Sequence, residues 1–555
     1  MKKIINFIAF VIVSTGLFAQ KWNGYTLYSN MNSTSAYLMD TFQATYHTWS
    51  GLAQTNYSSF LEPGGNLVRS VKLNGVSFVG GPIGGKIQKH DYAGNLIWDF
   101  TYSTVDYCQH HDICPMPNGN VLLISYERKS AAEVSAAGGN NAIEMWPDKI
   151  VEVQPTGLTT GNIVWEWKAW DHLMQNVDNT KSNYVTSLVN NPGLLNINYK
   201  QTKDWMHMNG VDYNPILDQV AFSSHNLNEI YIIDHSTTTA EAASHTGGNS
   251  GKGGDILYRW GSPQAYGASG ADIINVTHDA HWIKEGVPNA GRLSCVNNKG
   301  MSGPNTTTFD NVITPINGYN YDIVTGQAYA PASYTSRIVG QGYTSNMGSS
   351  EELPNGNTLL CLATTGKIYE VDPNGNTLWT KNVSSPQAHI YNSCYISNPA
   401  PAIPTITAAG NILSSTAATT YQWYLNGVLI SGATSQTYNA VASGVYVVRI
   451  TDVNGCVYQY SKGLKHNYIP DAIKENNLNE KISIFPNPTN GKINIKNVEL
   501  LGANYIVSVY NQMGQLLSNF SNQKEITLNK LPNGNYIISI SSEKGKATKT
   551  ITINN

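Results

Sequence analysis

The chain has 555 residues with a formal net charge of −3, and 13% of its residues are charged. Its length fits two to four domains, and its charged share is about half of that usual in soluble globular proteins. The near-neutral charge, without a dense cluster of Lys and Arg, excludes nucleic acid as a partner, and the abundance of Gly, Tyr, Asn, Ser and Thr favours β-structure with many turns.

The N-terminal residues 1–20 have the pattern of a secretory signal peptide. Lys2 and Lys3 precede an apolar run that ends at Phe18, and cleavage before Gln20 is plausible. No later stretch is apolar over the ~18 residues that a membrane span needs. We therefore expect an exported protein without an integral membrane segment.

A repeated unit fills residues 21–397. Each copy has a strand opened by a turn, a second strand, and a Gly-turn before a strand that ends in Trp, as in "EPGGNLV" and "GGKIQKHDYAGNLIW". The clearest copies end at Trp98, Trp165 and Trp379, weaker ones end at Trp49 and Trp260, and a sixth runs to Arg337 without a Trp. This period predicts an all-β fold led by a six-bladed β-propeller whose tryptophans pack between blades.

Three groups of histidines stand just before a strand that opens a unit, which in a propeller is the strand nearest the axis. They are His110 and His111 in "QHHDICPMPNGN", His207 in "DWMHMNG", and His278 and His281 in "THDAHWIKEG". A single one could be structural, but packing gives no reason for a titratable ring to recur in three successive units. We expect His111, His207 and His278 to meet in one central pocket, and His281 to face the opposite side of its strand as a supporting residue.

The six cysteines are too few for a disulfide scaffold. Cys108 and Cys114 flank "QHHDI", and a disulfide between them would pin this segment. The sequence leaves that pairing open because spacing does not establish the geometry that a disulfide requires.

Two further segments follow a Pro/Ala-rich linker. Residues 398–464 alternate short strands with Asn-Gly and Ser-Gly turns and resemble an immunoglobulin-like β-sandwich, although Cys456 is their only cysteine. After a linker at 465–480, residues 481–555 contain "FPNPTNG", "VYNQMGQLL" and "LPNGNYII" in order. This tail resembles the type A sorting domain of the type IX secretion system of Bacteroidetes, a β-sandwich, which implies that the type IX machinery exports the protein to the cell surface or beyond.

The motifs "HDICPMPNGNVLLI", "DWMHMNGVDYN", "WGSPQAYG" and "THDAHWI" resemble, in this order, those of the bacterial aryl-sulfotransferase family over about residues 22–395. The resemblance implies a six-bladed propeller that uses no nucleotide donor. It implies that His278, in a His-x-Ala setting, takes sulfate from an aryl sulfate and passes it to a phenol. His111, His207 and Asn209 match further family positions, and His225 stands where the family has an arginine, a stronger holder of a sulfuryl group.

The chemistry of these side chains agrees with that activity. A neutral imidazole at His278 can attack sulfur and give a sulfohistidine, which splits one transfer into two. His111 and His207 can donate to the sulfuryl oxygens or protonate the leaving phenolate, and Asn209 offers an amide donor. Asp279 is expected to orient a ring. We therefore predict an exported aryl-sulfate sulfotransferase with an aryl sulfate donor, a phenolic acceptor and no cofactor.

Three alternatives are less well supported. The histidines could bind zinc or copper, but no His-Glu-x-x-His or Cys-x-x-Cys pattern is present, so no metal is predicted. The segment "GGNSGKGG" at 247–254 has the wrong spacing for a phosphate loop and is expected to be a flexible surface loop. The propeller could also bind glycan or another surface ligand without catalysis, since fold alone does not fix function.

Overall fold

The computed structural model describes residues 20–301, 305–469 and 478–554. The expected signal peptide lies almost wholly outside the described residues, as do residues 470–477 of the 465–480 linker. No helix among these residues is long and apolar enough to cross a membrane. Contacts divide the chain into two compact units. The first holds the repeats and most of the segment that follows them, and the second holds the C-terminal region together with two short stretches, 409–412 and 439–443.

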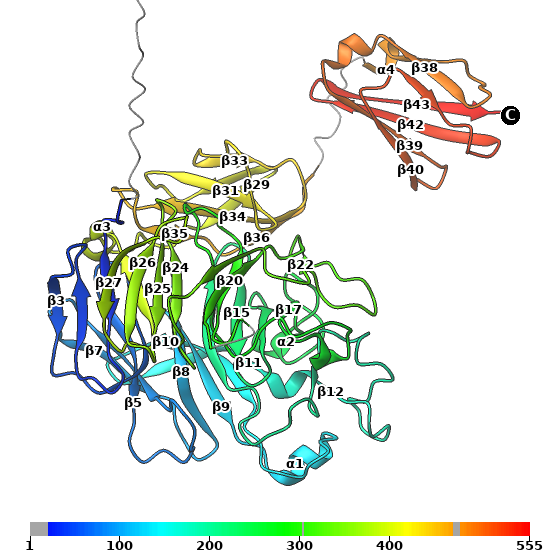
Figure 1. Ribbon diagram of the computed structural model, residues 1–555. Coiled ribbons are helices and arrows are strands. Elements are labelled where there is room, and N and C mark those ends of the chain that lie inside the picture. Colours follow the sequence, from blue (N-terminus) through cyan, green and yellow to red (C-terminus); the bar gives the residue numbers. More distant parts are fainter. Residues whose placement is uncertain (1–19, 302–304, 470–477, 555) are drawn as a thin grey trace, which may run out of the picture. The chain divides into compact units, whose positions relative to one another are not determined.

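Six antiparallel four-stranded sheets dominate the described part of the first unit (Figure 1). Sheet 1 is β28 (Ala388–Tyr391), β1 (Tyr25–Tyr28), β2 (Ala36–Met39) and β3 (Thr45–Trp49), and sheet 2 is β4 (Thr55–Leu61), β5 (Leu67–Lys72), β6 (Gly85–His90) and β7 (Leu96–Thr101). Sheet 3 is β8 (Tyr107–Pro115), β9 (Val121–Glu127), β10 (Asp148–Pro155) and β11 (Gly161–Lys168).

Sheets 4 to 6 continue the series along the chain. Sheet 4 is β14 (Met208–Asn214), β15 (Gln219–Ser224), β16 (Glu229–Asp234) and β17 (Tyr258–Trp260), and sheet 5 is β18 (Thr277–Trp282), β19 (Leu293–Asn297), β20 (Thr308–Val312) and β23 (Ser336–Val339). Sheet 6 is β24 (Ser349–Glu352), β25 (Thr358–Leu362), β26 (Lys367–Val371) and β27 (Thr377–Asn382). The predicted all-β class and propeller arrangement are confirmed.

Short elements fill the connections. They are α1 (Ala131–Ala136), η1 (Ala169–His172), α2 (Thr239–Ala242), η2 (Pro263–Tyr266), α3 (Ser393–Ser397), and the strand pairs β12 (Leu173–Met174) with β13 (Leu195–Asn196) and β21 (Ile316–Asn317) with β22 (Asn320–Tyr321).

Sheet 1 closes the series of sheets because its leading strand comes from the far end of the repeats. β28 pairs antiparallel with β1, for example Thr26 with Ile390. The leading strands of neighbouring sheets are in contact, and carboxylates join them by accepting backbone N–H groups of the next leading strand. These bonds are Asp112 to Val211, Asp212 to Trp282, Asp279 to Ser350 and Glu351 to Ile390.

The repeated tryptophans pack between sheets, as predicted. Trp49, Trp98, Trp165 and Trp260 lie in the last strands of sheets 1, 2, 3 and 4 and are buried. Their indole N–H groups donate to Asp91 O, Thr160 O, Thr237 Oγ1 and Pro331 O, respectively, each in the following sheet or its connections. Each of these rings therefore packs between its own sheet and the next sheet along the chain.

The segment after sheet 6 folds into further strands, some of which contact the repeats within the first unit. These strands are β29 (Ile406–Ala409), β30 (Ile412–Ser415), β31 (Tyr421–Leu425), β32 (Val428–Leu429), β33 (Thr437–Asn439), β34 (Gly444–Thr451), β35 (Tyr458–Tyr460) and β36 (Leu464–His466). Glu285, between β18 and β19, accepts bonds from Tyr424 and Tyr460 and pairs with Arg449 at 2.7 Å. These contacts hold the segment against sheet 5.

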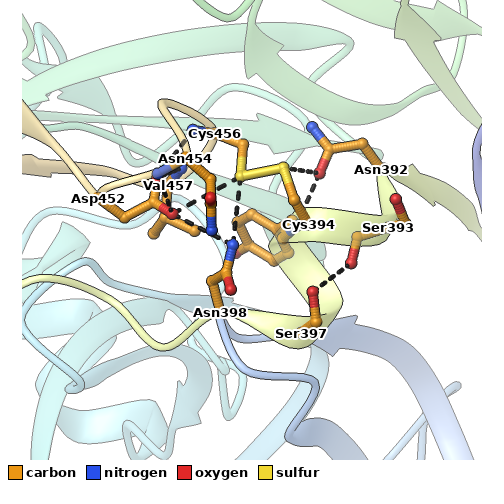
Figure 2. The surroundings of a disulfide bond; sticks show 10 residues. Asn392, Ser393, Cys394, Ser397, Asn398, Asp452, Asn454, Cys456 and Val457 are labelled. Atoms are coloured by element: carbon orange, nitrogen blue, oxygen red, sulfur yellow. Dashed lines mark hydrogen bonds between the residues drawn. A yellow bond between two sulfur atoms is a disulfide. The ribbon is translucent and has the colours of Figure 1, made fainter.

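A disulfide also joins this segment to α3. It links Cys394 to Cys456 (Figure 2). The pairing that the sequence left open is not formed, since Cys108 and Cys114 are free, buried thiols. Both lie in β8, and their partners in β9, Tyr126 and Leu122, are four residues apart, a rise of roughly 13 Å, compared with the ~5.5 Å between Cα atoms of a disulfide.

The thiol count tests this pairing. Denatured, unreduced protein is expected to react with four equivalents of a thiol reagent, at Cys108, Cys114, Cys295 and Cys361.

Loss of the Cys394–Cys456 bond through Cys456→Ser is expected to lower the free energy of unfolding by about 2–4 kcal/mol, because the bridge closes a long loop. Alkylation with peptide mapping and denaturant unfolding measure the two effects. Modification of Cys394 in unreduced protein would contradict the assignment.

The C-terminal unit is a pair of sheets over one apolar core (orange to red in Figure 1). Its elements are α4 (Leu478–Lys481), β37 (Ser483–Phe485), β38 (Lys492–Lys496), η3 (Val498–Leu501), β39 (Tyr505–Tyr510), β40 (Leu516–Ser521), β41 (Glu525–Thr527), β42 (Gly534–Ser542) and β43 (Gly545–Ile553). The expected C-terminal sandwich is present.

Candidate active site

Four imidazoles form a continuous row across the leading ends of sheets 3 to 5. The ring centroids of His111 and His207 are 4.5 Å apart, those of His207 and His225 are 5.1 Å apart, and those of His225 and His278 are 5.6 Å apart. His111 lies in β8, His207 directly precedes β14, His225 follows β15, and His278 lies in β18. The structure therefore brings together all four histidines that the sequence analysis selected.

Irregular backbone turns these side chains toward one another. The pairing of β8 with β9 shifts register between Gln109 and Ile113, and that of β18 with β19 shifts between His278 and His281. His111 and His207 adopt φ values of 47° and 52°, which non-glycine residues rarely use. Such bulges re-aim side chains in strands beside functional sites, and they explain why the histidines do not follow simple strand alternation.

Asn209 supports the backbone of the site. Its Nδ2 donates to Thr277 O at 2.8 Å, and its Oδ1 accepts from Ser223 Oγ at 2.6 Å. The neighbouring Gly210 allows this close approach, because a Cβ there would lie 2.8 Å from Asp279 N. With its amide oxygen bound and one amide hydrogen directed to β18, Asn209 holds β14 against the strand that carries His278.

The imidazole of His278 is oriented by Asn298. His278 Nδ1 lies 2.7 Å from Asn298 Oδ1, and Asn298 Nδ2 donates to the carbonyl oxygens of Thr344 and Met347. Those two bonds fix the amide orientation, so its oxygen faces His278 and the proton must be on Nδ1. Among the described residues Nε2 has no hydrogen-bond partner. In the neutral ring, Nε2 therefore carries the lone pair.

Burial keeps three of these rings neutral. Burial lowers the pKa of His278 well below its ordinary value, and repulsion from His225 whenever that ring is charged lowers it further. Burial and the charge of His207 likewise lower the pKa of His111 well below its ordinary value, and the same two causes lower the pKa of His225. A neutral imidazole at His278 is the nucleophilic form.

His207 differs from its three neighbours because it faces a carboxylate. Its Nδ1 lies 2.6 Å from Asp204 Oδ2, and the same oxygen accepts a bond from Tyr126 OH at 3.2 Å. Burial acts to raise the pKa of Asp204, but the hydrogen bond and charge of His207 outweigh it and hold that pKa below its ordinary value. The carboxylate of Asp204 is therefore placed to accept a hydrogen bond from Nδ1–H of His207.

A buried chain of hydrogen bonds connects His111 to His110 and Asp148. His111 Nδ1 lies 2.8 Å from His110 Nδ1, and His110 Nε2 lies 2.7 Å from Asp148 Oδ1. Burial raises the pKa of Asp148 well above its ordinary value. When Asp148 holds a proton, the bonds run from Asp148 to His110 to His111, which leaves Nε2 of His111 protonated and able to donate.

His281 lies away from the row of imidazoles, as the sequence analysis expected. Its Nδ1 is 3.3 Å from Asp279 Oδ2, and its Nε2 is 3.9 Å from Glu352. Burial acts to lower the pKa of His281, but Asp279 and Glu352 raise it well above the ordinary value. Asp279 therefore orients the ring of His281, not that of His278, and also joins sheets 5 and 6.

The hydrogen-bond partners of the histidines were not predicted from the sequence. The pairing of Asp204 with His207 could have been proposed from the sequence, because Asp204 precedes His207 by three residues in "DWMH". Asp148 lies 38 positions from His110, and Asn298 lies 20 positions from His278. No spacing rule connects these pairs, since the contacts arise from strand pairing and from the arrangement of the sheets.

Replacement of Asn298 by Ala is expected to lower kcat by about 10²-fold, because His278 would lose the acceptor that fixes its tautomer and orientation. The matched control is Asn297→Ala, since Asn297 is equally buried but donates to Ile273 O and Asp310 Oδ2 instead. Steady-state kinetics with an aryl sulfate would measure both. An equal loss in the two variants would mean that Asn298 acts only through stability.

Several solved structures are weakly similar to the chain. A protein of unknown function from Bacteroides caccae has 9% identity and a TM-score of 0.38, and the match covers 66% of this chain and 99% of that one. A virginiamycin B lyase from Staphylococcus aureus has 10% identity and a TM-score of 0.30, with 71% and 92% covered. A streptogramin B lyase has 10% identity and a TM-score of 0.32, with 66% and 79% covered. No curated protein matches the chain.

Two family models match. Residues 483–554 match the secretion system C-terminal sorting domain, which indicates type IX secretion and attachment at the cell surface. Residues 74–391, more than half of the chain, match the arylsulfotransferase (ASST) model. That match includes the four imidazoles and supports a sulfotransferase enzyme. The chain belongs to the arylsulfotransferase family.

Proposed function

We propose that this protein moves a sulfuryl group from an aryl sulfate to a phenolic acceptor through a sulfohistidine on Nε2 of His278. The observation that carries the proposal is the bond from His278 Nδ1 to Asn298, which leaves the Nε2 lone pair available beside three further imidazoles. Sulfuryl transfer, like phosphoryl transfer, needs an in-line nucleophile and donors around the equatorial oxygens, and it asks little else of the protein.

In the first half-reaction, Nε2 of His278 attacks sulfur, the S–N bond forms, and the S–O bond to the aryl group breaks. The leaving phenolate takes the Nε2 proton of His207 in its doubly protonated form, in which Asp204 accepts the bond from Nδ1–H. Nε2–H of His111 donates to a sulfuryl oxygen when Asp148 is protonated. Neutral phenol then departs, and His278 carries the sulfuryl group.

In the second half-reaction, an acceptor phenol occupies the place of the first. Its oxygen attacks sulfur, its proton passes to Nε2 of His207, and the S–N bond breaks. The electron pair of that bond returns to Nε2 of His278, so that both histidines regain their starting forms. One residue serves as acid in the first step and as base in the second, as microscopic reversibility requires.

The site holds an imidazole where the sequence comparison leads one to expect an arginine. His225 Nδ1 lies 2.8 Å from Asn226 Oδ1. Burial is the largest cause of the lowered pKa of His225, the charge of His207 adds to it, and the charge of Lys299 makes a smaller contribution in the same direction. Lys299 follows Asn298 directly. We assign to Lys299 the compensating positive charge near the sulfuryl oxygens, while His225 contacts the substrate as a neutral ring.

Turnover with a chromogenic aryl sulfate tests the proposal. Phenol release is expected to accelerate with added acceptor phenol, with one sulfated acceptor formed for each donor consumed. A rate of phenol release that does not change when acceptor phenol is added would identify a hydrolase at the same site. The absence of release from several aryl sulfates would favour a ligand-binding propeller without catalysis.

A further inference from the structure

The glycine-rich segment 247–254 belongs to an ordered turn that brings three polar side chains together. His245 precedes it and Asp255 follows it, and both meet His172 at the end of η1. Asp255 Oδ1 lies 2.9 Å from His172 Nδ1 and 2.7 Å from His245 Nδ1. The three ligand-type atoms lie within 4.8 Å of one another.

The orientation of His172 makes this cluster unusual. Its Nε2 lies 2.8 Å from Ala242 O, and because a carbonyl oxygen can only accept, Nε2 must carry a proton. In the neutral ring, Nδ1 then presents a lone pair to the carboxylate oxygen of Asp255. Two electron pairs at that distance repel unless a proton or a metal cation lies between them. A ring N–H bound to a backbone carbonyl is also the usual second contact of metal-ligating histidines.

The surroundings hold His172 in place. Its ring is fully buried and stacks on Trp167 with centroids 5.6 Å apart, and Trp167 Nε1 donates to Gly254 O at 2.7 Å. A Cβ on Gly254 would collide with Ala242 O and lie 2.6 Å from His172 Nε2. The glycine therefore permits the close packing that aims His172 Nδ1 at Asp255.

We infer that His172, His245 and Asp255 form a site for a divalent transition-metal ion of the zinc class. Two imidazoles and one carboxylate are a common protein ligand set for zinc, with water completing the coordination. His245 is 60% exposed, so the site is open to ions from solvent, whereas His172 is fully buried. The ion would tie the 243–255 turn of sheet 4 to η1, which follows sheet 3.

Calorimetric titration of tag-free, chelator-treated full chain with Zn²⁺ tests this site. We expect one tightly bound equivalent and a rise in Tm on binding. The exposed His245 is the first residue to change, since His245→Ala should leave the fold intact. The Zn²⁺ affinity of the His245→Ala variant is expected to fall at least roughly 10–100-fold, because the loss of a residue that only supports a metal ligand already causes a fall of that size. Asp255→Asn should give a similar loss.

Two controls separate this site from the four imidazoles of the active site. His278→Ala should keep the tight equivalent, and so should His47→Ala, a histidine that stacks on Tyr92. Unchanged Zn²⁺ affinity in both His245→Ala and Asp255→Asn would overturn the inference. Loss of the tight equivalent in His278→Ala would also overturn it, because the ion would then lie among the catalytic histidines.

Discussion

His278→Ala is expected to lower kcat/KM for an aryl sulfate by about 10⁴- to 10⁶-fold, the range seen when a covalent nucleophile is removed. The other three imidazoles would remain, but none of them occupies the position of His278. There, Asn298 accepts the hydrogen bond from Nδ1–H and leaves the Nε2 lone pair available to attack sulfur. The variant should still bind the donor, so KM is expected to change much less than kcat. Stopped-flow or steady-state release of a chromogenic phenol measures the loss.

His281→Gln is the matched control for that variant. His281 lies three residues along the same strand but pairs with Asp279 and Glu352 instead of joining the row of imidazoles. It should retain most of the activity, and circular dichroism should show both variants folded. Turnover by His278→Ala within about tenfold of the unaltered protein would contradict a nucleophilic role for His278.

His207→Ala is expected to have the second largest effect, and one that depends on the donor. Loss of a positioned proton donor costs about 10²–10⁴-fold when the leaving group needs a proton. Phenyl sulfate, whose phenolate is strongly basic, should lose rate in this range. 4-Nitrophenyl sulfate should lose much less, because 4-nitrophenolate departs without protonation. Rates for a series of substituted aryl sulfates would show a steeper dependence on phenol pKa in the variant.

His225→Ala is the matched comparison within the same row. Burial and the charge of His207 lower the pKa of His225, and the one proton of its neutral ring lies on Nδ1 and is donated to Asn226 Oδ1, so none is available for the leaving group. Its replacement should slow all donors by a similar factor, with an unchanged dependence on leaving group. If His207→Ala slowed every donor equally, His207 would be a holder of the sulfuryl oxygens and not an acid.

The repeats were the part of the fold that the sequence predicted best. Alternating strands, Gly-turns and terminal tryptophans have a local period, so the sheets and the packing role of Trp49, Trp98 and Trp260 could be read directly. The closing pair of β1 with β28 could not, because it joins residues more than 350 positions apart. The Cys394–Cys456 bridge had the same difficulty, while the nearer pair, Cys108 and Cys114, was held apart by its own strand.

For the site, recurrence in successive units predicted that His111, His207 and His278 would meet. What the sequence could not supply was their environment. Positive φ at His111 and His207 is uncommon for residues other than glycine, and it occurs at or beside strands whose pairing shifts register. The tautomer of His278 depends on Asn298, whose own orientation is set by two distant carbonyl groups. Proton positions of this kind follow from a completed hydrogen-bond network, not from spacing.

The most direct test of the account is to look for the sulfated histidine itself. Full-length protein would be incubated with excess aryl sulfate and no acceptor, denatured at alkaline pH, digested, and its peptides measured by mass spectrometry. The account predicts a sulfate-mass adduct on the peptide containing His278, and its disappearance when a phenol is added before denaturation. Acceptor-dependent turnover without that adduct, or an adduct on His111, His207 or His225 instead, would contradict it.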